Sequence, residues 1–449
     1  MLDLAANQFQ QRQQAAQSGR LADYKRRWQY YHGEQRQSLK VAEGQPNDNL
    51  VINLARYIVD KGAAFLFGKE VGFQLEEGSQ TSAEGALKQI WARNRKMTFL
   101  LKCATQGAIF GHVFIKILKD YYGPGLARFV LIDPEYVTCF WNGDDIEAAY
   151  RYLIEWTEQG PDGKAVNRQT DIVKDSATGR WSEIHRVSKG NRYEPDPAYP
   201  DIDPWPYNWP PIIDCQNIPC PGAFYGLSDL EDLDEQDALN YVASKTNRIL
   251  RYHSHPKTWG RGFQKSQAEI GPDEMMIING PTGELHNLEM QSDLSSSLNF
   301  YDRLEQACMR SGRVPNLTPH NLTVGAQSGF SLRILHGDLI EKTDAKRCTY
   351  GDMLIELNRR ALEMAGHGDG NVTRLDWADP LPVNATEAMA EDGFDLDRGL
   401  AAKSTVQAKR GYDPKSEDEK ITAESSAEDL RSGNVGSLIL RQFNQGQGV

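Results

Sequence analysis

The sequence has few apolar residues for its length and no long apolar run. Hydrophobic residues make up 39% of the 449 residues, and the mean hydropathy is −0.59, whereas average usage in globular domains is roughly 45–50% apolar. The most apolar stretch, residues 97–118, is interrupted by Lys102, Gln106, His112 and Lys116, so it falls short of the ~20 apolar residues of a membrane helix. Residues 1–20 lack the apolar core of a signal peptide. We therefore expect no membrane association, and either an elongated subunit or one that completes its core with neighbouring chains.

The chain also lacks an excess of basic residues. It carries 50 Lys and Arg against 62 Asp and Glu, for a formal net charge of −12. Proteins that grip DNA owe much of their affinity to Lys and Arg side chains that neutralise phosphates. If DNA is a partner, the charge indicates that it is not tightly held.

Disulfide and zinc-binding patterns are missing as well. The six cysteines include no Cys-x-x-Cys pair, and His253 and His255 have no second pair of ligands near them in sequence. Structural zinc sites are almost always built from four Cys or His ligands. We expect free thiols in a reducing compartment and no metal.

Motifs of the common catalytic sites are absent too. The chain contains no G-x-S-x-G, H-E-x-x-H or G-x-G-x-x-G sequence. The segment from Gly62 to Glu70 resembles a phosphate-binding loop but differs from it in two ways: its glycine spacing is wrong, and Glu70 stands where Ser or Thr is required. Its Phe-Leu-Phe centre instead predicts a buried helix end. Asp201, Asp203 and Asp214 could serve a metal-dependent nuclease, but a solvated Pro-rich loop is the simpler interpretation. We expect no catalytic residue and no cofactor.

The first half of the chain alternates between helical and β patterns. Near-helical spacing of apolar residues predicts helices over residues 22–34, 50–68 and 82–108. Nine prolines between residues 194 and 222 exclude a helix there and predict a long extended connection. Together these patterns predict an antiparallel α+β domain. Its strands are predicted over residues 112–118, 128–132, 136–141, 148–156 and 181–187.

Longer helices dominate the second half. The first has an acidic start and a basic end, which complements the helix macrodipole. The third would be on the order of 50 Å long at ~1.5 Å per residue. These helices are predicted over residues 228–252, 295–312 and 330–365. Shorter elements are predicted at residues 257–290 (β-like), 371–377 (a strand), 385–393, 404–411 and 415–431 (small helices).

The connection between the last two long helices is uncharged. Residues Asn316 to Gly329, NLTPHNLTVGAQSG, contain no Asp, Glu, Lys or Arg, although 25% of the whole chain is charged. Two interpretations stand. The loop is neutral by chance, or it must lie beside something charged without binding it strongly.

Three stretches of the chain carry a resemblance to a known family. They are Asn53-Leu-Ala-Arg56-Tyr-Ile-Val-Asp60-Lys-Gly62 with Phe65-Leu-Phe-Gly68-Lys, then Gly226-Leu-Ser-Asp-Leu-Glu231-Asp-Leu with Gln236-Asp-Ala-Leu-Asn240, and Trp377-Ala-Asp379-Pro-Leu-Pro382. In order and spacing they resemble the portal proteins of tailed double-stranded DNA phages. The resemblance covers most of the chain and implies an elongated α+β subunit that assembles into a ring, usually of twelve copies.

The resemblance implies a division of the chain into the parts of a portal subunit. Residues 1–225, with the strand after the long helix, would form a wing. The parts that follow would be stem helices at 226–254 and 295–314, a β-containing clip at 255–294, a tunnel loop at 315–329, a long helix with its wing strand at 330–383, and a helical crown with a tail at 384–449.

The resemblance also implies which residues meet other molecules. In the clip, Trp259, Met275 and Ile277 are expected to contact the packaging motor or an adaptor. The tunnel-loop residues expected to face passing DNA are Asn316, Thr318, His320, Asn321, Leu322, Thr323, Val324, Gln327 and Ser328.

A portal ring would sit at a unique capsid vertex, as a virion component assembled in the host cytoplasm. Double-stranded DNA would pass through it without sequence specificity during packaging and ejection. Its other partners would be the terminase large subunit, the major capsid and scaffolding proteins, and a head-completion or tail adaptor. Two alternatives stay open: a metal-dependent nuclease or terminase-like enzyme using Asp201 and Asp203, and a monomeric capsid-associated adaptor.

Overall fold

The computed structural model divides the chain into two compact units. One comprises Met1–Val324 and Arg333–Pro380, and the other Gly325–Leu332 and Leu381–Val449. Both helices and antiparallel sheets are present, so the predicted α+β class is confirmed. The structure describes residues 2–41, 43, 47–75, 81–160, 163–190, 192–254, 257–261, 284–288, 294–316, 329–368, 373–381, 385–410, 412 and 414–431.

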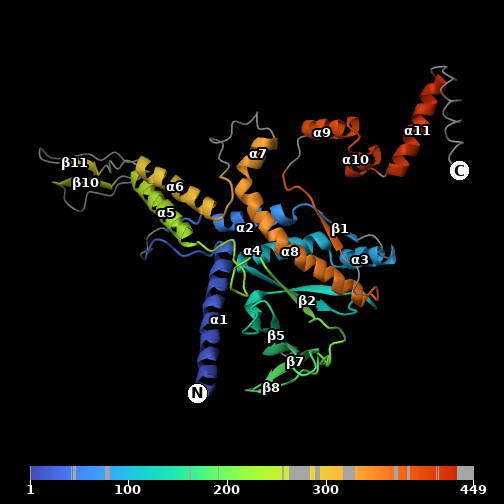
Figure 1. Cartoon of the computed structure of the whole chain (residues 1–449). Coiled ribbons are helices and arrows are strands. Elements are labelled where there is room, and N and C mark those ends of the chain that lie inside the picture. The colour runs from blue at the N-terminus through green and yellow to red at the C-terminus, as the bar shows by residue number, and fades with distance from the viewer. Residues whose placement is uncertain are drawn as a thin grey trace. The chain divides into compact units, whose positions relative to one another are not determined.

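Helices and strands alternate along the first unit (Figure 1). Its helices are α1 (Leu2–His32), α2 (Leu54–Phe67), α3 (Thr81–Arg93), α4 (Lys96–Phe110), α5 (Asp234–Ser254), α6 (Ser295–Ser311) and α8 (Gly337–Met364). Its strands are β1 (Val71–Leu75), β2 (His112–Leu118), β3 (Arg128–Ile132), β4 (Val137–Trp141), β5 (Ala149–Gln159), β6 (Ala165–Lys174), β7 (Trp181–Lys189), β8 (Arg192–Pro195), β9 (Ile212–Gln216), β10 (Lys257–Arg261), β11 (Glu284–Leu288) and β12 (Thr373–Trp377).

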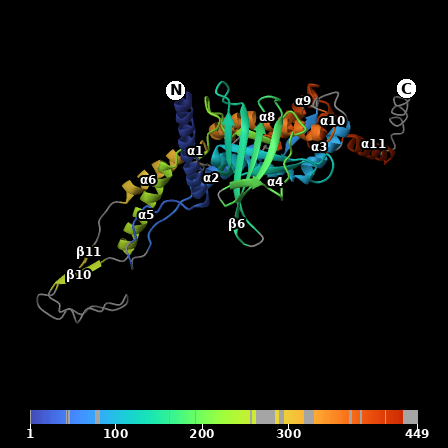
Figure 2. The same ribbon diagram turned by 90° about the horizontal axis from the view of Figure 1, so that it is seen from below.

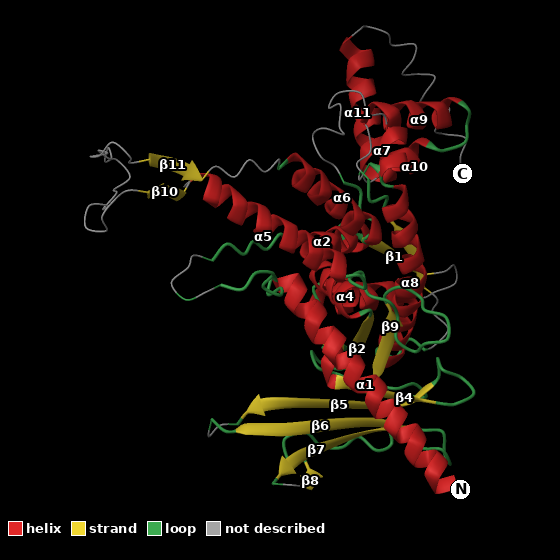
Figure 3. Cartoon of the chain, turned by 90° about the vertical axis from the view of Figure 1, so that its left-hand side faces the viewer, coloured by secondary structure: helices red, strands yellow, loops and turns green. Residues whose placement is uncertain are grey.

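The core of the first unit surrounds a three-stranded antiparallel sheet in the order β3-β2-β9. Successive side chains of a strand point to opposite faces, yet Val113, Phe114, Ile115 and Ile117 of the central strand are all fully buried. Both faces of this sheet are therefore covered. Helices α4 and α8 lie on one side of it, and the second sheet lies on the other (Figure 3).

The second sheet has five antiparallel strands in the order β4-β5-β6-β7-β8. Its inner face contributes Tyr152, Ile154, Ile172 and Trp181 to the same hydrophobic cluster as β2. The N-terminal helix α1 runs beside this sheet (Figure 2), where Arg20 donates to the carbonyl of Val137 at 3.1 Å. The two sheets and the helices thus share one core.

Helices α5 and α6 pack against each other and lead away from the sheets toward the β10-β11 hairpin (Figure 1). Strand β10 pairs with β11 in antiparallel register from Lys257↔Leu288 to Arg261↔Glu284. Farther along the chain, β12 pairs with β1. Among the described residues, no helix combines the length and apolar character needed to cross a membrane.

The second unit contains three short helices among its described residues. The side chain of Arg410 binds the buried carboxylate of Asp392 at 2.8 Å, and Gln407 donates to Asp418 at 3.2 Å. Helix α7 spans the boundary between the two units along the chain. The three short helices described in the second unit are α9 (Ala385–Asp397), α10 (Lys403–Lys409) and α11 (Pro414–Arg431), and their bounds are close to those predicted from the sequence.

The prediction of one continuous helix over residues 82–108 is wrong, because the segment forms two helices, α3 and α4. Arg95 between them adopts a left-handed backbone with φ of 52°. The buried Asn94 binds the carbonyl of Ala127 and the amide of Phe129, both at 2.9 Å. A tertiary bond to β3 therefore fixes this residue in the turn, against the helical pattern of its neighbours.

Other predicted boundaries also need correction. The N-terminal helix begins at Leu2 rather than at residue 22, and the helix predicted from residue 330 is interrupted at His336 between α7 (Gly329–Leu335) and α8. The helix predicted from residue 228 begins only at Asp234, because the preceding residues bind other elements. Strands β1, β6, β8 and β9 were not predicted; β6 carries few apolar residues and is stabilised by pairing on both sides.

Candidate functional site

Most of the residues predicted to meet DNA or the packaging motor lie outside the described part of the chain. Asn316 is described, and it ends the segment that leads into the neutral loop. Trp259 lies in β10 opposite His286, with its backbone alone described. The predicted residues outside the described part are Met275, Ile277, Thr318, His320, Asn321, Leu322, Thr323, Val324, Gln327 and Ser328.

The flanks of the neutral loop are well defined. Helix α6 ends at Ser311 and is capped by Gly312, and the next turn is closed by the amide of Val314, which donates to the carbonyl of Met309 at 2.9 Å. The side chains of Met309 and Val314 pack with Ile58 of α2 and Leu339 of α8 in a small buried cluster. The chain therefore approaches the neutral loop from α6 through a turn that packs on α2 and α8.

A group of buried charges lies beside this turn, and we call Asp229, Lys342 and Lys346 the charge cluster. The ammonium group of Lys346 lies 2.8 Å from Oδ2 of Asp229, and that of Lys342 lies 3.1 Å from the same oxygen. All three side chains are at most 4% exposed. Lys342 also donates to the carbonyl of Gly312 at 2.9 Å. One carboxylate thus faces two ammonium groups, which leaves one net positive charge inside the protein.

The segment before α5 reaches this position because it binds the end of α4. The amide of Asp229 donates to the carbonyl of Ala108 at 2.8 Å, and the hydroxyl of Ser228 donates to the same carbonyl at 2.8 Å. These bonds replace the helical ones that the sequence pattern predicts for Ser228 and Asp229. The second carboxylate oxygen of Asp229 accepts from Asn217 at 3.1 Å.

Glycines make room for the cluster. A Cβ atom on Gly62 of α2 would lie 2.8 Å from Oδ2 of Asp229, and one on Gly107 of α4 would lie 1.9 Å from the hydroxyl oxygen of Tyr350. That hydroxyl donates to Asn217 at 3.2 Å. The Gly62 segment is therefore part of a helix that packs closely on buried charges, in agreement with the buried helix end predicted from the sequence, and not a phosphate-binding loop.

Burial and charge act in opposite directions on the ionisable groups. Burial alone would raise the pKa of Asp229, but the charges of Lys346 and Lys342 hold that pKa below its usual value. Burial lowers the pKa of Lys346 to about 8, with the like charge of Lys342 adding to the effect and Asp229 opposing it. The lowered pKa of Asp229 and the lowered pKa of Lys346 are consistent with one carboxylate facing two ammonium groups, because a single negative charge cannot fully compensate two positive ones.

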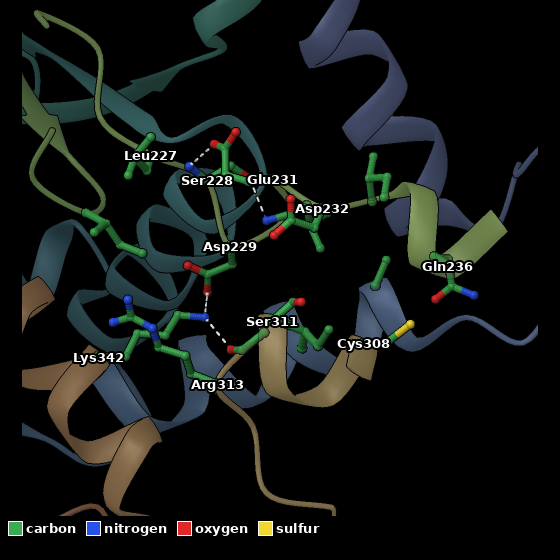
Figure 4. Close-up of a pocket in the computed structure, with 16 residues that line it drawn as sticks. Leu227, Ser228, Asp229, Glu231, Asp232, Gln236, Cys308, Ser311, Arg313 and Lys342 are labelled. Atoms are coloured by element: carbon green, nitrogen blue, oxygen red, sulfur yellow. Dashed lines mark hydrogen bonds and ion pairs between the residues drawn. The ribbon is translucent and has the colours of Figure 1, made fainter. Parts of the chain in front are cut away.

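A cavity of about 180 Å³ lies beside the charge cluster, between the start of α5 and the end of α6 (Figure 4). Lys342 lines it together with Asp229, Glu231, Asp232 and Ser311. Lys346 is not among the lining residues. The two lysines therefore differ: one is enclosed by protein, and the other borders open space that carries acidic groups.

A second polar arrangement fixes an extended segment, residues 48–54, along α5. Asn240 accepts from the amide of Ile52 at 2.9 Å, Gln236 donates to the carbonyl of Ile52 at 2.7 Å, and Ser244 accepts from the amide of Leu50 at 3.0 Å. These three α5 side chains are spaced four residues apart and are at most 3% exposed. We call this set of side chain to backbone bonds the amide ladder.

The far end of the amide ladder is ionic. Arg248 and Arg251 bind one oxygen of Asp48, at 3.0 and 2.7 Å. The Asp48 side chain is 4% exposed, whereas the arginines are about one third exposed. The basic end of α5 therefore does more than complement the helix dipole, because it also holds the extended segment.

The carboxylates considered for a nuclease have other partners. Asp201 accepts from the amide of His185 at 2.6 Å, and Asp203 accepts from the hydroxyl of Ser182 at 2.6 Å, so both bind β7. The expectation that Asp214 lies in a solvated loop is wrong: it lies in β9 and accepts from Tyr152 at 2.7 Å. In the described part of the chain, no three His, Cys, Asp or Glu side chains are grouped so that they could hold a metal ion.

With this geometry in place, comparison with known proteins decides the family. The family described as "Phage portal protein, SPP1 Gp6-like" matches residues 11–429. The chain belongs to this portal protein family. The match covers the charge cluster, the amide ladder and the neutral loop, and it confirms the resemblance seen in the sequence. The family is structural rather than catalytic.

Two solved structures are similar to the chain at a low level. They are titled "Neck of empty GTA particle computed with C6 symmetry", with a TM-score of 0.41, and "Virion of native gene transfer agent (GTA) particle", with a TM-score of 0.39. Each is 13% identical over 80% of this chain and 88% of the other. No protein with a curated description matches the sequence.

The sequence pattern did not predict the charge cluster. Lys342 and Lys346 fall in the polar stretch that interrupts the apolar spacing of the long helix, and such a stretch is typical of a solvated face. Asp229 stands more than a hundred residues earlier in the chain. A polar stretch within a helix whose other residues follow an apolar spacing was the available signal, because buried lysines require a buried counter-charge.

Proposed function

We propose that the chain is the subunit of a portal ring, usually of twelve copies, at one vertex of a phage-type capsid. The family match over residues 11–429 carries this proposal. In the virion the ring would be the conduit through which double-stranded DNA enters and leaves. It would dock the terminase large subunit during packaging and a head-completion or tail adaptor afterwards, and it would contact the major capsid and scaffolding proteins.

The surface of the α5-α6 pair supports association between copies. Tyr241 and Leu250 of α5 and Leu298 and Phe300 of α6 are 47–53% exposed. Each residue turns an α-helix by ~100°, so Leu298 and Phe300, two positions apart, point in nearly opposite directions. They therefore lie on opposite sides of the face of α6 that packs on α5. A ring subunit needs two different contact surfaces, one for each neighbour. Apolar residues on both flanks of the pair meet this requirement.

The charge of the chain supports a conduit that DNA slides through rather than one that grips it. A chain with a net charge of −12 repels the phosphate backbone on average. Within the ring, the neutral loop from Asn316 to Gly329 would lie nearest to the DNA and offer only weak neutral hydrogen bonds. Lysines at such positions would be multiplied by the ring symmetry into a strong site for phosphates.

This proposal is tested by adding charge to the loop. In particles assembled with Val324→Lys or Gln327→Lys, rings should form normally and packaging should slow or stall, more severely at low salt where screening is weak. Val324→Ser and Gln327→Ser are the matched controls and should package normally. Normal packaging by both Lys variants at low salt would show that neutrality of the loop has no role.

The docking role assigned to residues 255–294 is tested by deletion. Capsids assembled with a chain that lacks this segment should form but remain empty, because the packaging ATPase would have no platform. Deleting residues 432–449 provides a control that leaves the segment in place. Filling of the 255–294 deletion capsids at the normal rate would exclude this docking site.

The nuclease alternative finds no support in the positions of Asp201 and Asp203. Their carboxylates bind the backbone and side chain of β7, with Arg186 a further partner of Asp201 at 3.2 Å. We expect the purified chain to hydrolyse no ATP and to cut no DNA. DNA cleavage that co-purifies with the protein and is lost in Asp201→Asn or Asp203→Asn would favour the nuclease.

A further inference from the structure

The charge cluster contains one lysine that joins two parts of the chain and one that does not. Lys342 belongs to α8, which follows the neutral loop, and it binds Gly312, which precedes the loop. Lys346, one turn farther along α8, binds Asp229 instead. Lys342 therefore ties the turn at Gly312 to α8, and Lys346 does not contribute to this tie.

The bonds of Lys342 are the weaker ones in the cluster. It lies 3.1 Å from Asp229, against 2.8 Å for Lys346, and its closer partner, at 2.9 Å, is the neutral carbonyl of Gly312. A carbonyl compensates an ammonium charge less well than a carboxylate does. Of the two lysines, Lys342 thus has the longer ion pair and a neutral second partner.

The cavity gives Lys342 a place to go. It already lines this space of about 180 Å³ together with Asp232, Glu231 and Arg313 (Figure 4), and the carboxylate of Glu231 is bound by Arg27 and by the amide of Ser228, both at 2.7 Å. A lysine side chain is long and flexible, so its ammonium group can move by several ångströms while its backbone stays in α8. Moving there would separate the two ammonium groups, which repel each other in the present arrangement.

We propose that Lys342 is a latch that holds the turn before the neutral loop against α8 and opens when its ammonium group leaves Gly312 for the adjacent cavity. Asp229 and Lys346 form the fixed pair behind it. When the latch is closed, the turn at Gly312–Val314 is held against α8. When it is open, this turn is held only by its own hydrogen bonds and by the apolar contacts of Val314 and Met309 with Leu339 and Ile58.

The latch itself does not depend on the proposed function, but its consequence does. In a portal ring, the turn at Gly312–Val314 would set where the chain enters the neutral loop. An opening latch would let the turn before the loop shift while α8 remains packed in the core. Lys342 would then be a positioning residue for the loop, acting through Gly312 without touching DNA.

Hydrogen exchange on the purified full-length chain tests the latch without any packaging assay. The amides of Gly312, Arg313 and Val314 donate within the turn, to the carbonyls of Cys308, Arg310 and Met309. In Lys342→Met these amides should exchange about ten to a hundred times faster, the range expected for losing one hydrogen bond to a charged group. Lys346→Met is the matched control on the same helix and should leave their exchange unchanged within about twofold.

The remaining outcomes are equally informative. Equal acceleration in both variants would show that the cluster only stabilises the fold, and no acceleration in Lys342→Met would show that Gly312 needs no latch; either result overturns the proposal. If one of the variants fails to fold, Lys342→Arg offers a second comparison, because it keeps the charge and a donor near Gly312 and should restore slow exchange. Failure of the chain to form rings would refute the proposed function and leave the exchange result untouched.

Discussion

The amide ladder and the charge cluster hold distant parts of the chain together by different means. In the ladder, neutral side chains of α5 bind backbone groups of residues 48–54, while Leu50 and Val51 point their own side chains outward at 42–44% exposure. In the cluster, two lysines bind one carboxylate, and all three side chains have almost no exposure. The ladder therefore constrains α5 and leaves the side chains of Leu50 and Val51 free to vary, whereas the cluster constrains every member.

The largest effect is expected from neutralising the shared carboxylate. Asp229→Asn would leave Lys342 and Lys346 buried without a counter-charge, at a cost of about 3–5 kcal/mol in the free energy of unfolding. Denaturant titration at neutral pH measures this cost. Lys346→Met serves as the control, because it leaves one lysine opposite the carboxylate and should cost much less. A loss below about 1 kcal/mol for Asp229→Asn would show that the cluster is not buried as described.

A pH titration sharpens the same contrast. The pKa of Lys346 is about 8 in the folded chain, against 10.5 for an ordinary lysine. Between these values the unfolded chain binds a proton that the folded chain has released, so this group makes the folded state more stable as pH rises from 8 to 10.5 and adds no slope below that window.

The wild-type chain should therefore gain stability relative to Lys346→Met by up to roughly 3 kcal/mol across this window. Taking the difference between the two proteins removes the contributions of the tyrosines and cysteines that also titrate at high pH. The measurement is the free energy of unfolding of both proteins from pH 7 to 10.5. A difference that stays flat would mean that Lys346 is not held with a lowered pKa.

A smaller effect is expected in the amide ladder. Asn240→Ala removes the acceptor of the Ile52 amide and a donor to Gln35, at a position that is 1% exposed. The cost should be about 1–3 kcal/mol, since a buried amide loses its partner. Thermal or denaturant unfolding measures it. If Asn240→Ala were as stable as wild type, the extended segment would be held by something other than α5.

The smallest effect on stability is expected for the exposed side chains that the amide ladder does not bind. Val51→Ala removes an exposed side chain whose backbone stays in place, so the free energy of unfolding should change by less than about 0.5 kcal/mol. Assembly is the more sensitive readout, because Val51 is an exposed apolar group beside α5. A large loss of stability in the isolated chain would contradict the view that Val51 is bound through its backbone neighbours alone.

Local patterns in the sequence predicted much of the fold. The apolar spacing of Leu54, Ile58 and Phe65 gave helix α2, and the strands from β2 to β5 were found close to their observed positions. Elements that depend on partners far along the chain were missed. The break at Arg95 is set by Asn94 binding β3, and β6 is a strand because of its two neighbours.

The site was only partly accessible to sequence reasoning for the same physical reason. The neutral loop is visible as composition, and its role remains a prediction, as do the clip contacts of Trp259, Met275 and Ile277. The charge cluster could not be predicted from local spacing, because Asp229 and Lys346 meet only when α2, α4, α6 and α8 are packed together. A polar residue in a helix indicates either solvent or a buried partner, and the sequence alone does not distinguish the two.

Native mass spectrometry of the purified full-length chain tests the central claim most directly. A portal subunit with apolar groups on both flanks of its α5-α6 pair should assemble into a closed ring, with a mass of about 0.6 MDa for twelve copies of the 50.5 kDa chain. Electron microscopy of the same sample should show a central channel. A stable 50.5 kDa monomer at micromolar concentration and moderate salt would contradict the account.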